Sequence, residues 1–234
     1  MSLSLTAQKA LTAYGGEDRW QKASAVEAVV SASGLLFWMK GHRPFRRLSI
    51  QMEIQRSRVR FRPIDRSGNT AVLEGQTVRI EDSRDRVLQE RPEARRFFAK
   101  GRRLFYWDNL DHAYFSGYAL WNYLTFPALL IRKDIRWQEP SPGTLTAQFP
   151  PEIPTHCPEQ QFFFDSSTGL LKQHNYTAEV VGPWAKAAHV VLEHSCWEGL
   201  PFPSKRRVTP RKPDGSPRPF PTLVAITVHE WRLS

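Results

Sequence analysis

Residues 107–127 read WDNLDHAYFSGYALWNYLTFP, and this stretch is predicted to form a helix. Asp108 is a residue type that caps helix N-termini, and Asp111 places a carboxylate in the first turn, where the helix dipole favours negative charge. Pro127 prevents the helix from continuing far, because proline lacks the backbone N–H that the next turn needs. The stretch is therefore a helix with well-marked ends.

The apolar residues of this helix do not form a single stripe. One side carries Leu110, Tyr114, Tyr118 and Trp121, whereas Phe115, Leu120 and Tyr123 point elsewhere. A helix that is apolar on nearly all sides must be buried on more than one side. We therefore expect other parts of the chain to surround it.

The sequence on both sides of this helix is typical of β-strands. In residues 48–55 apolar and polar residues alternate, as in a strand with one buried face. The first predicted strand, 26–40, contains Gly34 at a point where a strand would bulge or bend. The other predicted strands are 48–55, 58–63, 70–74, 77–82, 86–90, 134–138, 144–149, 160–165, 170–179, 187–197, 205–210 and 223–231.

Many antiparallel strands and one apolar helix predict a mainly β fold. The compact arrangement is a strongly curved antiparallel sheet, an open half-barrel, wrapped around the central helix. A short N-terminal helix is expected at residues 5–14, where apolar residues recur at helical spacing before Gly15 and Gly16. All-β domains often reach 234 residues, so we predict a single domain over 1–234 with a Pro-rich loop at 210–221.

The chain carries a formal net charge of +10. Its basic residues occur as scattered groups, such as Lys205–Arg206–Arg207, rather than as one dense run. This pattern predicts a generally basic, solvated surface. It leaves an anionic membrane surface as a partner to consider, disfavours nucleic acid, and says nothing about the oligomeric state.

Cysteine content and the N-terminus predict a cytoplasmic protein. Cys157 and Cys196 are too few for a disulfide framework in a chain of this length. The first residues lack the basic start, apolar run and cleavage site of a secretory signal. No segment approaches the ~18 uninterrupted apolar residues of a membrane span.

The aromatic content suggests a ligand-binding interior. We expect large rings from the helix and the first strand, together with a polar pair that can orient a head group, to line it. Ordinary core packing explains the same residues, and that alternative stays open. The candidates are Phe37, Trp38, Trp107, Tyr118, Trp121, Tyr123, Phe126, His174, Tyr176 and Trp184.

Patterns for metal binding and catalysis are weak. His194 and Cys196 would share one face of a strand, but a zinc site needs three or four ligands, so no metal is predicted. No Gly-x-Ser-x-Gly, Gly-x-Gly-x-x-Gly or P-loop string occurs, so neither a nucleophile nor a cofactor is predicted. An enzyme of unknown chemistry that uses His174 or Asp108 remains an alternative.

Several short segments give the chain a resemblance to a known superfamily. These are 26–34 (VEAVVSASG), 73–82 (LEGQTVRIED) and 169–174 (GLLKQH). They resemble strands and hairpins of the bacterial lipoprotein-carrier superfamily, and 117–127 is similar to a segment of uncharacterised bacterial proteins. The resemblance implies an N-terminal helix, an incomplete antiparallel barrel and a helix that covers an apolar cavity. The chain departs from that family in lacking an export signal and a lipidated cysteine near its start.

The leading hypothesis is a non-enzymatic carrier that holds a lipid or other apolar ligand between the curved sheet and its helix. A basic-surface module that binds anionic membrane or nucleic acid is the first alternative. The second is the enzyme of unknown chemistry.

Overall fold

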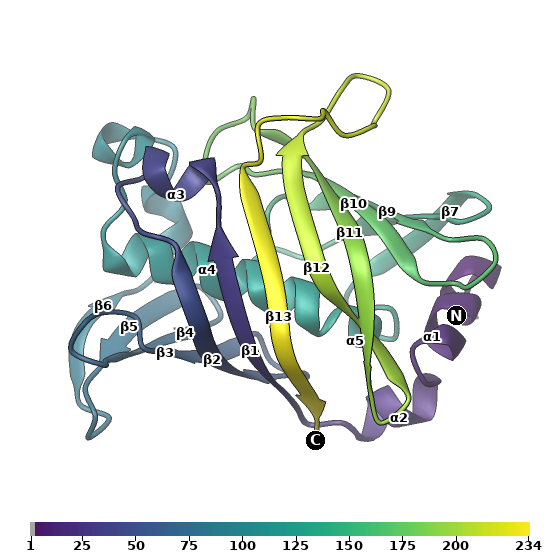
Figure 1. Ribbon diagram of the computed structural model, residues 1–234, viewed down its shortest axis with the longest axis horizontal. Helices are drawn as coiled ribbons and strands as arrows, with labels where there is room; N and C mark the ends of the chain where they lie inside the picture. Colours follow the sequence, from purple (N-terminus) through teal and green to yellow (C-terminus); the bar gives the residue numbers. More distant parts are fainter. Residues whose placement is uncertain (1–2) are drawn as a thin grey trace.

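The computed structural model describes residues 3–234, and in this range the strands form one sheet of thirteen (Figure 1). Neighbouring strands are antiparallel, and the order across the sheet is β6-β5-β4-β3-β2-β1-β13-β12-β11-β10-β9-β8-β7. The strands are β1 (Ala25–Ser33), β2 (Phe45–Glu53), β3 (Arg58–Arg62), β4 (Thr70–Glu74), β5 (Thr77–Glu81), β6 (Val87–Arg91), β7 (Arg136–Ser141), β8 (Thr144–Gln148), β9 (Glu159–Phe164), β10 (Leu171–Thr177), β11 (Lys186–Trp197), β12 (Leu200–Pro210) and β13 (Val224–Leu233).

The first and last strands meet at the middle of the sheet. β1 pairs with β13 from Val26 opposite Leu233 to Ser33 opposite Ala225. The two halves of the chain are joined there, and the outer strands β6 and β7 are not hydrogen-bonded to each other. The sheet is therefore curved but open, as the alternating sequence pattern predicts.

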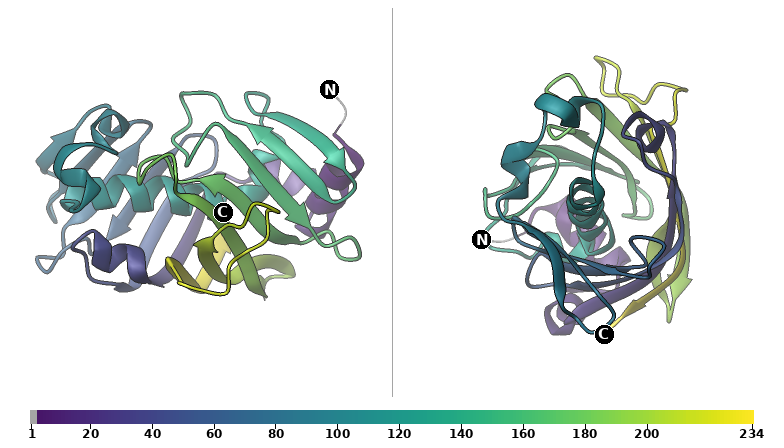
Figure 2. Two further views of the ribbon diagram at one scale, coloured as in Figure 1. Left: turned by 90° about the horizontal axis from the view of Figure 1, so that it is seen from above. Right: turned by 90° about the vertical axis from the view of Figure 1, so that its left-hand side faces the viewer.

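The helices lie at the end of the sheet near the N-terminus, at the rim, and within the curve. They are α1 (Leu5–Ala13), α2 (Glu17–Lys22), α3 (Leu35–Met39), α4 (Asn109–Leu124) and α5 (Phe126–Leu129), with 3₁₀ turns η1 (Ala94–Phe97) and η2 (Gly101–Leu104). Figure 2 shows α4 end-on inside the curved sheet. No helix of residues 3–234 has both the length and the apolar character needed to cross a bilayer.

Helix α4 begins as its sequence predicts. Asp108 accepts a hydrogen bond from the Asp111 backbone N–H, and the Asp111 carboxylate accepts one from the Asp108 backbone N–H, which completes a capping box. Every residue from Leu110 to Leu124 is buried. The prediction of a central apolar helix inside an open half-barrel is confirmed.

One side of α4 lies very close to the sheet. A Cβ atom added at Gly117 would lie 3.0 Å from Leu73 of β4 and 3.5 Å from Phe61 of β3. Glycine therefore permits the helix to approach β3 and β4 closely, and α4 packs mainly against the β3–β6 half of the sheet. The opposite side of the helix faces the central strands, where the candidate site lies.

The sequence-based boundaries are correct to within a few residues for most elements, with two corrections. The strand predicted over 26–40 ends at Ser33, and Leu35–Met39 is helix α3. Strand β12 begins at Leu200, five residues before the predicted start, because it pairs with β11 along its whole length.

Gly34 explains why β1 stops. Its φ of 132° is a conformation that residues with a Cβ rarely adopt, and an added Cβ would lie 2.4 Å from the Leu223 carbonyl oxygen. The chain turns at this glycine into α3, and the Leu35 and Leu36 N–H groups donate to the Thr222 and Leu223 carbonyls.

Replacing Gly34 by alanine tests this turn. We expect Gly34→Ala to lower the free energy of unfolding by about 3 kcal/mol or more, because strain and a backbone clash add together. Gly199→Ala is the matched control: Gly199 has a φ of 78° but open space around the added Cβ, so only about 1 kcal/mol is expected. Urea unfolding of both variants gives the comparison, and equal losses would contradict the role of Gly34.

Candidate functional site

A narrow apolar slot separates α4 from the central strands of the sheet. Its free volume is about 30 Å³, room for one or two water molecules. Its lining consists of Ala32, Phe37, Phe45, Phe115, Ser116, Ala119, Leu120, Tyr123, Tyr176, Val208, Val224 and Ile226. The space between α4 and the central strands is therefore nearly filled in this conformation.

The helix side of the slot follows from helical spacing. Phe115, Ala119 and Tyr123 are four residues apart and share one face of α4. This face points away from Gly117, the point of closest approach to β3 and β4. Small side chains at Ser116 and Ala119 leave the gap that the bulky neighbours do not fill.

A buried polar network adjoins one end of the slot. The Tyr123 hydroxyl lies 2.6 Å from His156 Nε2 and 2.7 Å from the Tyr176 hydroxyl, and the Tyr118 hydroxyl lies 3.2 Å from His156 Nδ1. These contacts give partners to tyrosine hydroxyls that burial would otherwise leave unpaired. Burial raises the pKa of Tyr123 and Tyr118 and lowers that of His156, so all three side chains are neutral near pH 7.

Arg206 lies beside this network and is only 2% exposed. Its Nη2 donates to the Tyr123 carbonyl oxygen at 2.8 Å, and its guanidinium carbon lies 5.4 Å from the centre of the Tyr123 ring. Within residues 3–234 no carboxylate forms an ion pair with Arg206, and its Nε has no hydrogen-bond partner. The sequence pattern placed this arginine on the basic surface, and that interpretation is wrong.

His189 and His174 complete the polar side of the interior. His189 is fully buried, its ring centre lies 4.3 Å from that of Tyr123, and both ring nitrogens lack partners among the described residues. His174 Nε2 lies 2.6 Å from Gln160 Oε1. Burial lowers the pKa of both histidines well below 6.5.

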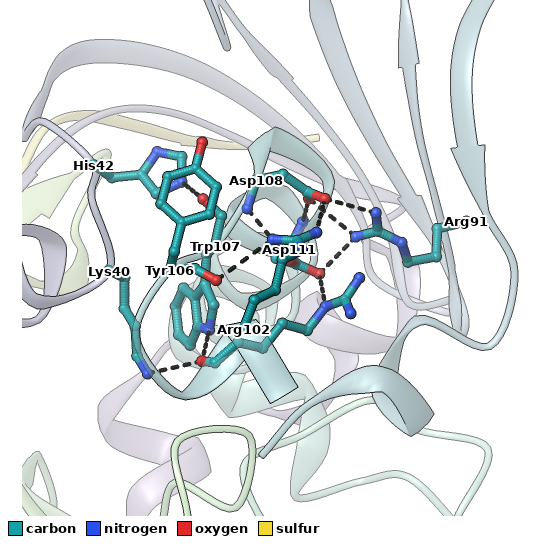
Figure 3. A network of polar contacts seen from close by, with 9 residues as sticks. Lys40, His42, Arg91, Arg102, Tyr106, Trp107, Asp108 and Asp111 are labelled. Carbon is teal, nitrogen blue, oxygen red and sulfur yellow. Dashed lines mark hydrogen bonds and ion pairs between the residues drawn. The ribbon is translucent and has the colours of Figure 1, made fainter. Parts of the chain in front are cut away.

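Figure 3 shows the ion pairs at the N-terminus of α4. Arg91 binds Asp108 at 2.8 Å and Asp111 at 2.5 Å, and the fully buried Asp111 also accepts from Arg103 Nε at 2.7 Å. Burial alone would raise the pKa of Asp108, but hydrogen bonds from Arg91 and the Asp111 backbone outweigh it and hold the pKa well below its usual value. Both aspartates thus fix the start of α4.

Exposed aromatic side chains gather at one end of the sheet, next to the slot. The Trp107 backbone N–H donates to the Lys40 carbonyl. The His42 ring stacks on Tyr106, so α3 and the segment after η2 lie side by side (Figure 3). The loops that follow β10 and β12 rise at the same end (Figure 1). We call this set the aromatic rim: Trp38, Phe105, Tyr106, Trp184 and Phe220.

The structure brings together only part of the predicted lining. Phe37, Tyr123 and Tyr176 border the slot. Trp107 borders a smaller gap of about 10 Å³ beneath α3. The others that are buried but lie away from the slot are Tyr118, Trp121, Phe126 and His174.

Trp38 and Trp184 were wrongly placed in the interior. Trp38 is 72% exposed because it lies on α3 rather than on a strand, and Trp184 is 70% exposed in the loop before β11. Arg206 and His189 are interior residues that the sequence analysis missed. Strand alternation was the available signal, since Ser204, Arg206 and Val208 recur at every second position of β12 and are all buried.

The fold and slot define an open antiparallel half-barrel that encloses a central helix. A LolA superfamily protein from Nitrosomonas europaea shares this architecture, with a TM-score of 0.50 and 11% identity over 99% of this chain and 94% of that one. The chain therefore has the lipoprotein-carrier-like fold that its sequence resembles.

Two further solved structures align over most of the chain. A DUF1329 family protein from Desulfovibrio piger gives a TM-score of 0.41 at 11% identity, covering 97% of this chain and 91% of that one. A domain described as a putative outer membrane lipoprotein-sorting protein, from Vibrio parahaemolyticus, gives a TM-score of 0.42 at 9% identity, covering 97% of this chain and 90% of that one. No protein-family model and no curated protein sequence matches the chain.

The buried histidines predict sensitivity to acid. Burial holds His156, His174 and His189 neutral in the folded protein, with pKa values well below the 6.5 of the unfolded chain. The unfolded state therefore binds more protons below pH 6.5, and stability that is present above this pH is lost as the pH falls. From pH 7 to pH 5 each histidine can contribute a loss of about 2 kcal/mol.

Urea unfolding across this pH range measures the effect. Burial also lowers the pKa of His112 to about 3 and that of His194 to about 4, so five histidines contribute to the loss. His189→Phe is therefore expected to remove about one fifth of the histidine-dependent loss. Tyr176→Phe, which removes a hydroxyl from the same cluster but no imidazole, should leave the pH dependence unchanged. A His189→Phe variant with the full pH dependence of the original protein would show that His189 is protonated in the folded state.

Proposed function

We propose that the protein is a non-enzymatic carrier that holds an apolar molecule between α4 and the central strands of the sheet. The one-sided packing of α4 is the observation that carries this proposal. The helix is held tightly against β3 and β4 through Gly117, but its other face meets the central strands across an apolar slot. The lipoprotein-carrier-like fold supports the same function.

Binding requires the slot to widen. Drug-sized ligands occupy sites of roughly 300–1,000 Å³, far more than the slot offers. The described structure is therefore the closed form, and a ligand would enter by separating α4 from β1, β12 and β13. The helix is anchored by the capping box at one end and by the Tyr123 contacts at the other.

No observation favours the enzyme alternative over the carrier. Asp108 belongs to the capping box and its ion pairs, and His174 packs flat on Phe162 at 4.1 Å between ring centres. Burial raises the pKa of the Cys157 thiol to about 11, so it is protonated near pH 7. Each of these residues has a structural role.

Filling the slot should block binding. Ala32 of β1 lines the slot, and Ala225 of β13 is half-buried and points away from it. We expect Ala32→Leu to weaken binding of the neutral fluorophore N-phenyl-1-naphthylamine about 10-fold or more, a cost of ~1.4 kcal/mol. Ala225→Leu, the matched control on the adjacent strand, should bind as the original protein does.

Fluorescence titration measures both affinities, with urea unfolding as the check that both variants fold. Equal binding by the two variants would remove the slot as the site. Native mass spectrometry of protein purified from its own cells, followed by organic extraction, identifies any bound apolar molecule. A protein that neither carries such a molecule nor binds the fluorophore is not a carrier.

The aromatic rim favours a second function, docking on an anionic bilayer. Phe105 is 77% and Phe220 76% exposed, and amphipathic Trp and Tyr side chains suit the membrane interface. The rim residues lie in the segments 35–44, 98–107, 178–186 and 211–223, and the exposed acids of these segments are Glu179 and Asp214. The same segments carry the exposed basic residues Arg43, Lys100, Arg102, Lys186, Lys212 and Arg218.

The rim also borders the slot, because both include residues of helix α3. Phe37 lines the slot, and the next residue, Trp38, belongs to the rim. A bilayer on the rim would therefore lie next to the point at which an apolar ligand enters. Such a contact combines burial of aromatic rings with attraction between basic side chains and anionic lipids.

Vesicle flotation tests the rim. The protein is expected to float with vesicles of phosphatidylglycerol and phosphatidylcholine, much less with phosphatidylcholine alone, and less as salt rises to ~0.5 M. The double variant Trp38→Ala, Phe105→Ala should lose about 10-fold in vesicle affinity, whereas Leu5→Ala, at an exposed position of α1, should lose little. If the protein floats equally with anionic and neutral vesicles, and the double variant floats as the original protein does, this docking mode is ruled out.

A further inference from the structure

Arg206 is a buried positive charge that no carboxylate among residues 3–234 offsets. Arg206 is buried, and the pKa of its guanidinium, lowered by burial to about 10, still leaves it charged at pH 7. A buried charge without a partner of opposite sign costs several kcal/mol. The ionisable groups that act on Arg206 with opposite sign are the hydroxyls of Tyr14, Tyr123 and Tyr176, and because burial raises their pKa values they carry no charge at pH 7.

The hydrogen-bond donors around this charge are also unused. Arg206 Nε has no partner in the described structure, and its Nη2 binds only a backbone carbonyl. Neutral His189 carries one N–H, and neither of its ring nitrogens has a partner within residues 3–234. Such groups are normally paired in folded proteins, so the unpaired Arg206 Nε and the unpaired His189 imidazole point to an acceptor that binds beside them.

These donors lie just beyond the inner end of the apolar slot, against the ring of Tyr123, which lines it. Val208 and Arg206 are alternate residues on the inner face of β12, and Val208 lines the slot. Arg206 also stands opposite Ile226 of β13, another lining residue, and His189 stands opposite Val208. Arg206 is further from the rim than Val208, because β12 reaches the rim at Pro210. A chain lying in the widened slot would thus end at Arg206.

We propose that the carried molecule is a long-chain amphiphile with a carboxylate head group, and that Arg206 binds this carboxylate at the inner end of the slot. This inference rests on the carrier function proposed above. One guanidinium supplies one positive charge, which a monoanion neutralises. Its planar set of N–H donors matches the two oxygens of a carboxylate. His189 adds a neutral donor that suits the same acceptor.

The test compares ligands that differ only in the head group. Dodecanoate and dodecanol share one alkyl chain, and each can displace N-phenyl-1-naphthylamine from the protein at pH 7.5. We expect dodecanoate to bind about 10-fold or more tightly than dodecanol. Arg206→Met should remove this preference by weakening dodecanoate alone, and dodecanol should bind both proteins equally.

Two further variants separate charge, shape and folding. Arg206→Lys keeps the charge without the planar donors and should retain part of the preference. Arg207→Met, at the neighbouring half-buried position of β12 whose side chain points to the other face, is the matched control and should keep all of it. Replacing an uncompensated buried charge by methionine is expected to preserve folding, which urea unfolding checks. If Arg206→Met fails to fold, the dodecanoate-to-dodecanol affinity ratio of Arg206→Lys tests the inference alone, and a ratio equal to that of the original protein would contradict it.

The outcomes distinguish this inference from the function on which it rests. Equal dodecanoate-to-dodecanol ratios in the original protein and Arg206→Met would overturn the head-group site and leave the carrier intact. A failure of dodecanoate, dodecanol and the fluorophore to bind would overturn both. Dodecyl phosphate that binds more tightly than dodecanoate, and does so only with Arg206 present, would replace the carboxylate by a phosphate head group.

Discussion

The aromatic helix α4 is buried by a sheet that curves around it, and the other elements depend on this contact. Each large ring removes roughly 150–250 Å² from water when it is buried, and α4 is buried from Leu110 to Leu124. A flat sheet would cover one side of such a helix. Curvature lets thirteen strands surround it, and the meeting of β1 with β13 at the centre joins the two halves of the chain around the helix.

The way α4 is buried also creates the candidate site. Gly117 allows close packing against β3 and β4, so the helix lies off-centre and leaves the apolar slot on the side of β1, β12 and β13. The tyrosine hydroxyls that α4 brings into the interior need partners, and His156 and Tyr176 supply them. The same burial therefore produces an apolar gap and, at its inner end, a polar network that includes an unpaired guanidinium.

Basic side chains in this protein occur in three distinct environments. Most of the basic surplus is solvated, where single ion pairs contribute little to stability. Three arginines instead fix the start of α4 through Asp108 and Asp111. Arg206 differs from all of these because it is buried beside the Tyr123 ring and, among residues 3–234, no carboxylate forms an ion pair with it. A closed slot, a buried cation and an aromatic rim at the entrance are the features that a carrier of an anionic amphiphile would need.

The sequence by itself determined the strands, the capped apolar helix and hence the open half-barrel, because alternation, capping residues and apolar periodicity are local signals. Only the tertiary structure decided which residues face the interior. Gly34 turns the chain before Trp38, which places that ring on the rim instead of on a strand. Arg206 lies in a basic run that is typical of a surface, but the pairing of β12 with β11 and β13 directs its side chain inward. Side-chain direction depends on register and curvature, which are fixed by contacts between residues far apart in the chain.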